Sequence, residues 1–272
     1  MGPSEANADP QSFDRLAADY DRYASLEPPL ILDWLRIQLP GRGGRALDAG
    51  CGSGRHTLAL ADRFDQVVGV DRSQPLIDIA RHKRPHPHIR YQIGDLMAIT
   101  DPAGFDLVSS STTLHHLPDL EAALGHLLGL VAPGGTAILI DNVAPRPTPP
   151  GWVYRLGAIR DLPADARRHG WPQAWWLLKF RTSTPWLEHL TGDRYLSRQG
   201  FEQRYGAVFP GARFHALGHT HALLWHSPAK PPGGSATGSY QGETWMLDSP
   251  ERVSAGQARF KYPATFVLFS SL

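Results

Sequence analysis

This chain of 272 residues has almost no cysteine and no long apolar run. The single cysteine, Cys51, excludes an internal disulfide and is compatible with a reducing compartment, so we expect a cytoplasmic protein. No apolar run approaches the roughly 20 residues of a membrane-spanning helix, and the N-terminus lacks the apolar segment of a signal peptide. These absences favour a protein that relies on a buried core alone.

An excess of charge is also missing, because 27 basic residues face 26 acidic ones and leave a net charge of +1. A balance of this kind provides no overall field that would attract nucleic acid or an anionic membrane. We therefore expect a small-molecule partner, with neither nucleic acid nor membrane. The oligomeric state, monomer or homodimer, is left open. With 42% hydrophobic residues, the chain has room for one large α/β domain with an insertion.

A glycine-rich turn is the strongest motif in the chain. A short apolar strand ends at Asp48, three glycines follow at Gly50, Gly52 and Gly54, and a helical pattern begins at Arg55. Glycines allow a sharp turn and let a ligand lie against the backbone. A dinucleotide-binding fingerprint is disfavoured, because Arg55 stands where its third glycine belongs and Asp48 would repel a pyrophosphate. A carboxylate at this position suits a ligand whose near end is cationic.

The segment Asp48-Ala49-Gly50-Cys51-Gly52-Ser53-Gly54 resembles the first motif of class I S-adenosylmethionine-dependent methyltransferases. The resemblance implies that Asp48 holds the amino group of the cofactor's methionine moiety and that the glycine turn, with the small Cys51, makes room for the cofactor. Residues 13–21 are similar to the N-terminal segment of many small-molecule methyltransferases, which folds over the cofactor as a lid. Tyr20 is then either a cofactor contact or an ordinary core aromatic.

Polar residues follow three further strands of the predicted sheet. Asp71 ends a buried apolar run about twenty residues beyond the glycine turn, the offset at which a carboxylate accepts the hydroxyls of a ribose. Its neighbour Arg72 either lies along the adenine or points to solvent. By resemblance, Asp95 bonds the adenine amino group and the backbone of Leu96 reads the edge of the ring. Ser111 ends the fourth strand at the same edge of the sheet, where ligands bind in such folds.

The alternation of strands and helices predicts a doubly wound, mostly parallel α/β sheet of Rossmann-like type. The resemblance adds seven strands, the last of them antiparallel, and covers about residues 13–226. We assign residues 1–11 to a disordered N-terminus, 12–144 and 197–226 to the cofactor-binding core, 145–196 to a helical, Trp-rich cap, and 227–272 to a linker and a tail without an assigned role. Five of the eight tryptophans lie in 145–196. Some are expected to form the core of the cap and others to face an aromatic substrate.

Two histidines, His115 and His116, follow the fourth strand, close to the expected position of the transferred methyl group. One of them is a candidate for the base that removes an acceptor proton, since histidine titrates in the right range; the alternative is that the pair only starts the next helix. Asp141, after the fifth strand, is a second catalytic candidate. No metal site is expected, because Asp141 and Asn142 lack the second carboxylate that magnesium requires. The late histidines His219, His221 and His226 also lack matching ligands and are expected at surface or edge positions.

These residues predict methyl transfer to a small, aromatic or polyketide-like molecule, with oxygen favoured over nitrogen or carbon because the histidines supply a base. Secondary metabolism is the expected setting. The motifs that mark nucleic-acid and protein-arginine methyltransferases are absent after the fourth strand. Two alternatives remain: a protein of the same fold that uses the cofactor for a cyclisation or rearrangement, and a non-catalytic binding protein.

Overall fold

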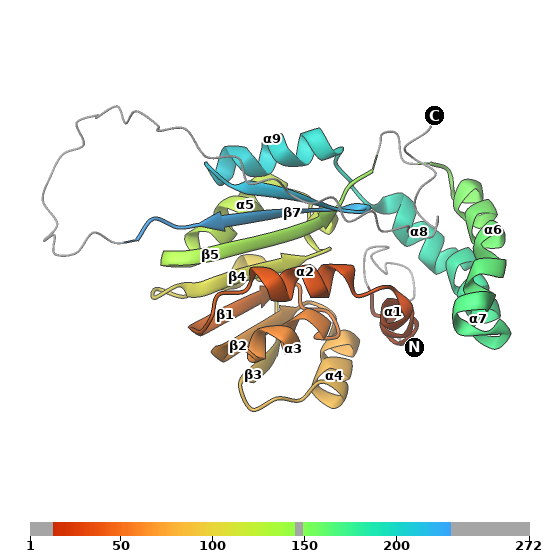
Figure 1. Cartoon of the computed structure of the whole chain (residues 1–272), viewed down its shortest axis with the longest axis horizontal. Helices are drawn as coiled ribbons and strands as arrows, with labels where there is room; N and C mark the ends of the chain where they lie inside the picture. Colours follow the sequence, from red (N-terminus) through yellow and green to blue (C-terminus); the bar gives the residue numbers. More distant parts are fainter. Residues whose placement is uncertain (1–12, 145–148, 230–272) are drawn as a thin grey trace, which may run out of the picture.

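A single seven-stranded sheet forms the centre of the computed structural model, which describes residues 13–144 and 149–229 (Figure 1). The strands lie in the order β3-β2-β1-β4-β5-β7-β6. β7 runs antiparallel to both of its neighbours, and the other neighbouring strands pair in parallel. Their bounds are β1 Gly43–Ala49, β2 Phe64–Asp71, β3 Ile89–Ile93, β4 Phe105–Ser111, β5 Val131–Asn142, β6 Arg213–Leu217 and β7 Thr220–His226. The predicted Rossmann-like sheet is confirmed.

Helices cover both faces of this sheet, since successive residues of the central strands point to opposite sides. Leu47 and Leu139 pack with α5 and α9, whereas Ala46 and Ile138 pack with α2 and α3. Each face therefore carries its own apolar core. The α-helices of the described residues are α1 Ala17–Leu26, α2 Leu30–Gln38, α3 Arg55–Ala61, α4 Gln74–Lys83, α5 Leu120–Gly129, α6 Gly151–His169, α7 Trp171–Thr182, α8 Thr184–Gly192 and α9 Arg198–Val208.

The pattern Pro133-Gly134-Gly135 is typical of a turn, which would start the fifth strand at residue 136, but β5 begins earlier. The strand begins at Val131, which pairs with Phe105, and the register between β4 and β5 shifts before Thr136 pairs with Leu107. The residues between these two pairs include Gly134, whose positive φ of 79° accommodates the irregularity. Gly134 and Gly135, which are typical of a turn, thus lie within β5 where its pairing with β4 is irregular.

His221 contradicts the expected surface or edge position. Because β7 lies between β5 and β6, it is not an edge strand, and His221 is buried beneath α9. Its Nε2 lies 2.8 Å from Oε1 of Glu202 on that helix. The sequence could not reveal this position, since the order of strands in the sheet differs from their order in the chain.

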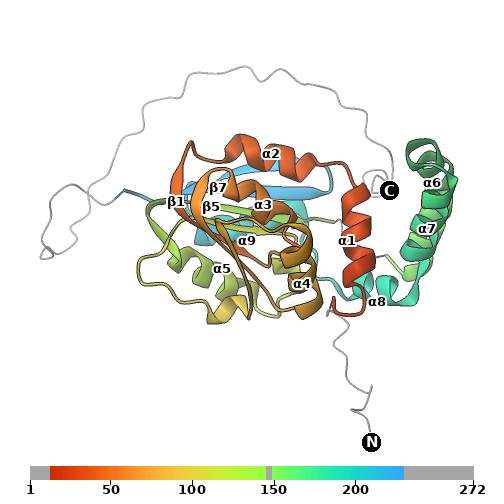
Figure 2. The same cartoon turned by 90° about the horizontal axis from the view of Figure 1, so that it is seen from below.

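Helices α6 and α7 form a hairpin that lies outermost on one side of the molecule, beyond α1 (Figures 1 and 2). None of the described helices is both long and apolar enough to cross a bilayer. Trp186 is buried and Trp176 half-buried in a cluster that also contains residues of α1. The other three tryptophans of this segment, Trp152, Trp171 and Trp175, are exposed.

Candidate active site

The glycine turn connects β1 to α3 and requires glycine for two separate reasons. Gly50, Gly52 and Gly54 have φ values of 76°, 51° and 81°, a region that side chains with a Cβ rarely adopt. In addition, a Cβ at Gly50 would lie 2.2 Å from Cγ2 of Thr113, and one at Gly54 would lie 2.5 Å from the hydroxyl of Tyr91. The turn is therefore packed against Thr113, which follows β4, and against Tyr91 on β3.

Replacing Gly50 by alanine is expected to lower the free energy of unfolding by about 1–3 kcal/mol, because backbone strain and the clash with Thr113 add together. Gly125→Ala is the matched control: it lies in α5 with nothing within 4 Å of the new Cβ, and alanine is expected to stabilise the helix by about 0.5–1 kcal/mol. Urea unfolding of both variants checks this. Equal stabilities would show that the turn does not need glycine at position 50.

The two acids that flank the turn are held by different partners. Asp48 is buried at the end of β1, where its Oδ2 accepts a hydrogen bond of 2.6 Å from the hydroxyl of Thr57. Burial raises the pKa of Asp48 to about 6, with a smaller contribution from the nearby Asp71. Asp71 accepts the N–H of Gly52 at 2.8 Å through Oδ2 and the N–H of Ser73 at 2.9 Å through Oδ1. The second carboxylate therefore closes the glycine turn from the side of β2.

The other cofactor candidates lie along the same edge of the sheet. Asp95 is exposed at the end of β3, where its Oδ1 accepts the N–H of Met97, and Leu96 beside it is buried. Arg72 is exposed, which favours the solvent-facing alternative. Cys51 is a buried thiol whose pKa is raised by burial, so a packing role suits it. Ser111 is buried where β4 ends.

Helix α1 is held across this edge by polar contacts from its middle and from the segment that precedes it. The buried carboxylate of Asp21 lies 2.7 Å from Nζ of Lys83 and 2.9 Å from Nη2 of Arg84, both at the end of α4. Before the helix begins, Asp14 accepts a hydrogen bond of 2.7 Å from Ser73, the residue that caps α4. These contacts hold α1 and the segment before it against α4, next to the glycine turn, where the predicted N-terminal lid would lie.

Tyr20 projects from α1 toward the end of β4. Burial raises the pKa of Tyr20, and the nearby side chain of Thr112 partly offsets this rise. Thr112 has a φ of 51°, which for a β-branched residue is a strained conformation of the kind found at functional sites. The ring of Tyr20 also lies 4.6 Å, centroid to centroid, from that of Phe13. Tyr20 thus lies between the glycine turn and the loop that carries the two histidines.

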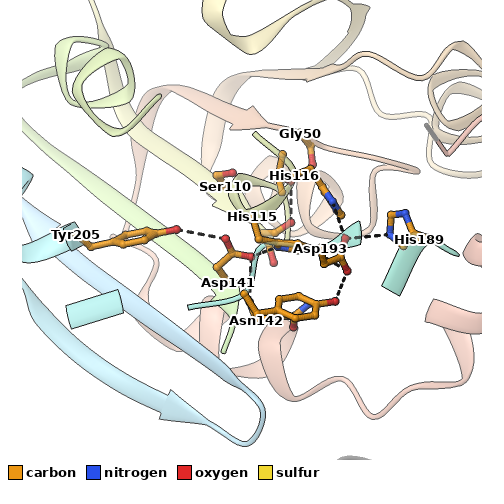
Figure 3. A network of polar contacts seen from close by, with 12 residues as sticks. Gly50, Ser110, His115, His116, Asp141, Asn142, His189, Asp193 and Tyr205 are labelled. Atoms are coloured by element: carbon orange, nitrogen blue, oxygen red, sulfur yellow. Dashed lines mark hydrogen bonds and ion pairs between the residues drawn. The ribbon is translucent and has the colours of Figure 1, made fainter. Parts of the chain in front are cut away.

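Two histidine–carboxylate pairs meet in that loop (Figure 3). Nδ1 of His115 is hydrogen-bonded to Oδ1 of Asp141, which also accepts the N–H of Asn142. Nδ1 of His116 lies 3.2 Å from Oδ1 of Asp193, and the centroids of the two imidazoles are 3.9 Å apart. The three catalytic candidates named from the sequence therefore lie together, and a fourth residue, Asp193, joins them.

The pKa values of the two histidines shift in opposite directions. Burial disfavours the charged form of His115, but the carboxylates of Asp141 and Asp193 outweigh it and raise the pKa of His115. Burial lowers the pKa of His116, and the neighbouring His115 adds to this, while Asp193 opposes it. Two adjacent imidazoles whose pKa values shift in opposite directions are a typical arrangement for acid–base catalysis.

Asp193 and its surroundings were missed by the sequence analysis. Asp193 is buried between α8 and α9, accepts a hydrogen bond from the hydroxyl of Tyr195, and lies 4.0 Å from Nε2 of His189 on α8. The contacts with His115 and His116 hold the pKa of Asp193 low despite its burial. No local signal marks the segment Gly192-Asp193-Arg194, because the loop meets the histidines only through the packing of α8.

Among the described residues, His115, His116 and Asp193 bring potential metal-ligand atoms within 4.8 Å of one another. Two imidazoles and one carboxylate are a ligand set that zinc or iron accepts. The same distances also fit hydrogen-bonded acid–base pairs, which the contact of 3.2 Å between His116 and Asp193 favours.

Known proteins that resemble this chain in sequence or in fold include several methyltransferases. Residues 46–135 match the family model of a methyltransferase domain. A ubiquinone biosynthesis O-methyltransferase of Coxiella burnetii is 34% identical over 147 residues, which cover 50% of this chain and 63% of that protein. The chain thus matches less than two thirds of the length of this curated relative.

Two solved structures share the fold at low sequence identity. Phosphoethanolamine N-methyltransferase 2 of Haemonchus contortus, in complex with S-adenosyl-L-methionine, has a TM-score of 0.58 and 14% identity, covering 82% of this chain and 61% of that chain. A possible histamine N-methyltransferase of Thermotoga maritima has a TM-score of 0.53 and 16% identity, covering 79% and 98%. Residues 46–135 therefore match a methyltransferase domain, and the described part of the chain shares the fold of these two structures.

Proposed function

We propose that this protein transfers a methyl group from S-adenosylmethionine to a small acceptor molecule. The observation that carries the proposal is the meeting, at one edge of the sheet, of the glycine turn with its two acids and the histidine–carboxylate cluster. The two parts lie close together, because Asp71 beside the glycine turn is near enough to His116 for the imidazole to influence the pKa of the carboxyl. Burial raises that pKa, and the backbone hydrogen bonds and His116 oppose the rise. Thr113, just before the histidines, packs against Gly50.

The cofactor would lie against the bare backbone at Gly50, Gly52 and Gly54, under the lid formed by α1. In this proposal Asp48 faces the cationic amino group and Asp71 accepts the ribose hydroxyls. Asp95 and the backbone of Leu96 face the adenine, with Ser111 and Tyr20 closing the methyl side. These roles suit the charges of the ligand, because carboxylates bind both an ammonium group and hydroxyl donors.

On the acceptor side, we propose an oxygen nucleophile whose proton passes to the histidine cluster. His116, with its lowered pKa, is neutral near pH 7 and would accept the proton through Nε2, while Asp193 stabilises the resulting imidazolium at Nδ1. The rings of Phe13 and Tyr195 lie 5.6 and 4.9 Å, centroid to centroid, from those of His116 and His115, and the ring of Trp186 lies 5.5 Å from that of His189. Such a lining supports an aromatic acceptor. The name of the Coxiella relative, an O-methyltransferase, supports oxygen as well.

The test is incubation of the purified protein with methyl-labelled S-adenosylmethionine and a panel of hydroxylated aromatic compounds. Label in a phenolic ether supports the proposal. A product that is rearranged but carries no label would support the alternative, in which the cofactor promotes a reaction without methyl transfer. Absence of cofactor binding by calorimetry would instead favour a non-catalytic binding protein.

The affinity for S-adenosylmethionine is expected to fall as the pH drops below about 6. Asp48 has a raised pKa of about 6, so its carboxylate is present above that pH and is lost below it. If the carboxylate faces the ammonium group, the affinity falls by up to about tenfold per pH unit below 6 and is level from 6 to 7. Calorimetry between pH 4.5 and 7 checks this. Asp48→Asn should bind weakly at every pH, and an unchanged profile in that variant would contradict the assignment.

We further propose that methyl transfer needs no metal. Dialysis against a chelator is then expected to leave the rate unchanged within the error of the assay, because a histidine–carboxylate pair already supplies the proton acceptor. The rate before and after dialysis is the measurement. Loss of activity that zinc or iron restores would contradict this and would identify His115, His116 and Asp193 as ligands.

A further inference from the structure

The outer face of the α6–α7 hairpin is apolar, although it points away from the rest of the molecule. On α6 the exposed and the buried residues form two opposite stripes, each with helical spacing. The exposed stripe is Trp152, Leu156, Ile159 and Pro163, and the inward stripe is Tyr154, Ala158, Asp161 and Asp165. On α7, Trp171 and Trp175 are exposed one turn apart, while Ala174 and Leu177 are buried. The usual order of an amphipathic helix is therefore reversed.

The extent of this exposure is unusual for a surface in contact with water alone. Trp152, Leu156, Ile159, Trp171 and Trp175 are between 51% and 61% exposed. They make up five of the nine exposed large hydrophobic residues in the described part of the chain. A gathering of this kind marks a surface that binds something.

The charges of the hairpin are sorted in the same way. Residues 151–182 contain six basic and two acidic residues. Both acids, Asp161 and Asp165, are buried: Asp161 accepts hydrogen bonds from Arg160, and Asp165 lies 2.7 Å from Nη1 of Arg181. The exposed charged residues of the hairpin are all basic, namely Arg155, Arg160, Arg167, Arg168 and Lys179. A protein with a net charge of only +1 thus presents a locally cationic face.

We propose that the outer face of α6–α7 docks on the surface of an anionic phospholipid bilayer. Tryptophan prefers the boundary between headgroups and acyl chains, and aliphatic residues beside it enter the apolar layer. Arginine and lysine around them bind anionic headgroups. The hairpin lies parallel to the membrane without crossing it, in keeping with the absence of a spanning helix among the described ones. The net charge close to zero had led us to expect no membrane partner.

Three other occupants fit the face less well. A second copy would bring two cationic faces together, and no exposed acid of the hairpin would balance them. The segment 230–272 of the same chain has four basic and three acidic residues and so offers no complementary charge. A nucleic acid would match the charge, but Leu156 and Ile159 cannot stack on bases, whereas a lipid bilayer accepts both features.

The test is flotation of the full, untagged chain with vesicles of phosphatidylcholine alone and with vesicles that also contain phosphatidylglycerol. Binding at least tenfold stronger to the anionic vesicles is expected, and it should weaken as salt is raised. The double variant Trp171→Ser/Trp175→Ser and the double variant Arg167→Glu/Arg168→Glu should each lose at least tenfold in binding. Ile37→Ser, which removes an exposed apolar residue from α2, is the matched control and should bind as the wild type does.

The proposal is overturned if the wild type does not float with anionic vesicles, or if the hairpin variants bind as tightly as the control. It is also overturned if sedimentation shows a dimer that these variants dissociate, since the face would then be an interface between copies. Affinity for S-adenosylmethionine should be unchanged in all of the variants, which shows that they fold. Failure of this proposal therefore leaves the proposed methyl transfer untouched.

Discussion

Asparagine in place of Asp141 is expected to reduce kcat for methyl transfer by about 10²–10⁴, while the Kd for S-adenosylmethionine stays within about twofold. Asp141 contacts Nδ1 of His115, the N–H of Asn142 and, at 3.3 Å, the hydroxyl of Tyr205. The amide oxygen can still accept the proton on Nδ1, but the amide carries no negative charge, and that charge contributes to the raised pKa of His115. The charged form of the imidazole is then less favoured, which weakens its part in the proton transfer. Turnover with a labelled cofactor and calorimetry give the two quantities.

The matched control for Asp141 is Glu202 on α9, whose partner His221 lies opposite Asp141 on the neighbouring strand β7. Glu202→Gln alters another carboxylate that pairs with a buried imidazole. Its activity is expected to be unchanged. Retention of cofactor binding in Asp141→Asn shows that the variant folds. Wild-type turnover in that variant would remove the His115–Asp141 pair from the reaction.

A second large effect is expected for Asp71→Asn, which should weaken binding of S-adenosylmethionine by about 10–100-fold. Both oxygens of Asp71 accept backbone N–H groups, from Gly52 and from Ser73. Asparagine has one acceptor oxygen, so its NH₂ group would face a backbone donor, and hydrogen bonds to a charged group are worth about 1.5–3 kcal/mol. The ribose would also lose its carboxylate acceptor. Calorimetry measures the affinity directly.

Asp78→Asn is the control for this variant, because Asp78 is an exposed acid on the neighbouring helix α4 that pairs with Arg81. It should bind the cofactor as the wild type does. At saturating cofactor, Asp71→Asn is expected to keep kcat within a few-fold, since Asp71 has no part in the proton transfer. Equal affinities in the two variants would mean that Asp71 holds the loop only and does not touch the ligand.

Much of the cofactor side could be predicted because its information is local. The turn at Gly50 needs a positive φ and the close approach of the Thr113 side chain, and glycine is the residue that satisfies both requirements. Asp48 and Asp71 end buried strands, and parallel strands bring their carboxyl ends to one edge of the sheet. The cap of α4 at Ser73, shortly before Pro75, is likewise encoded by adjacent residues.

The acceptor side could be predicted only in part, because it is assembled from distant segments. His115 and His116 follow β4, and Asp141 lies near the end of the neighbouring strand β5, so the pattern of strands placed them near one another. Asp193 reaches them across more than seventy residues through the packing of α8. Such a contact depends on how the helices fold back onto the sheet, and no spacing in the sequence encodes it.

The sequence by itself determined the alternation of elements, the doubly wound sheet and the chemistry of the glycine turn, since periodicity and local backbone preference act over a few residues. Only the tertiary structure decided that Asp193 completes the histidine cluster and that α6–α7 turns Trp152, Trp171 and Trp175 outward. It also buried Asp161 and Asp165 while leaving the neighbouring arginines exposed. Net charge counts every residue equally, whereas a partner meets only the charges that folding leaves in water.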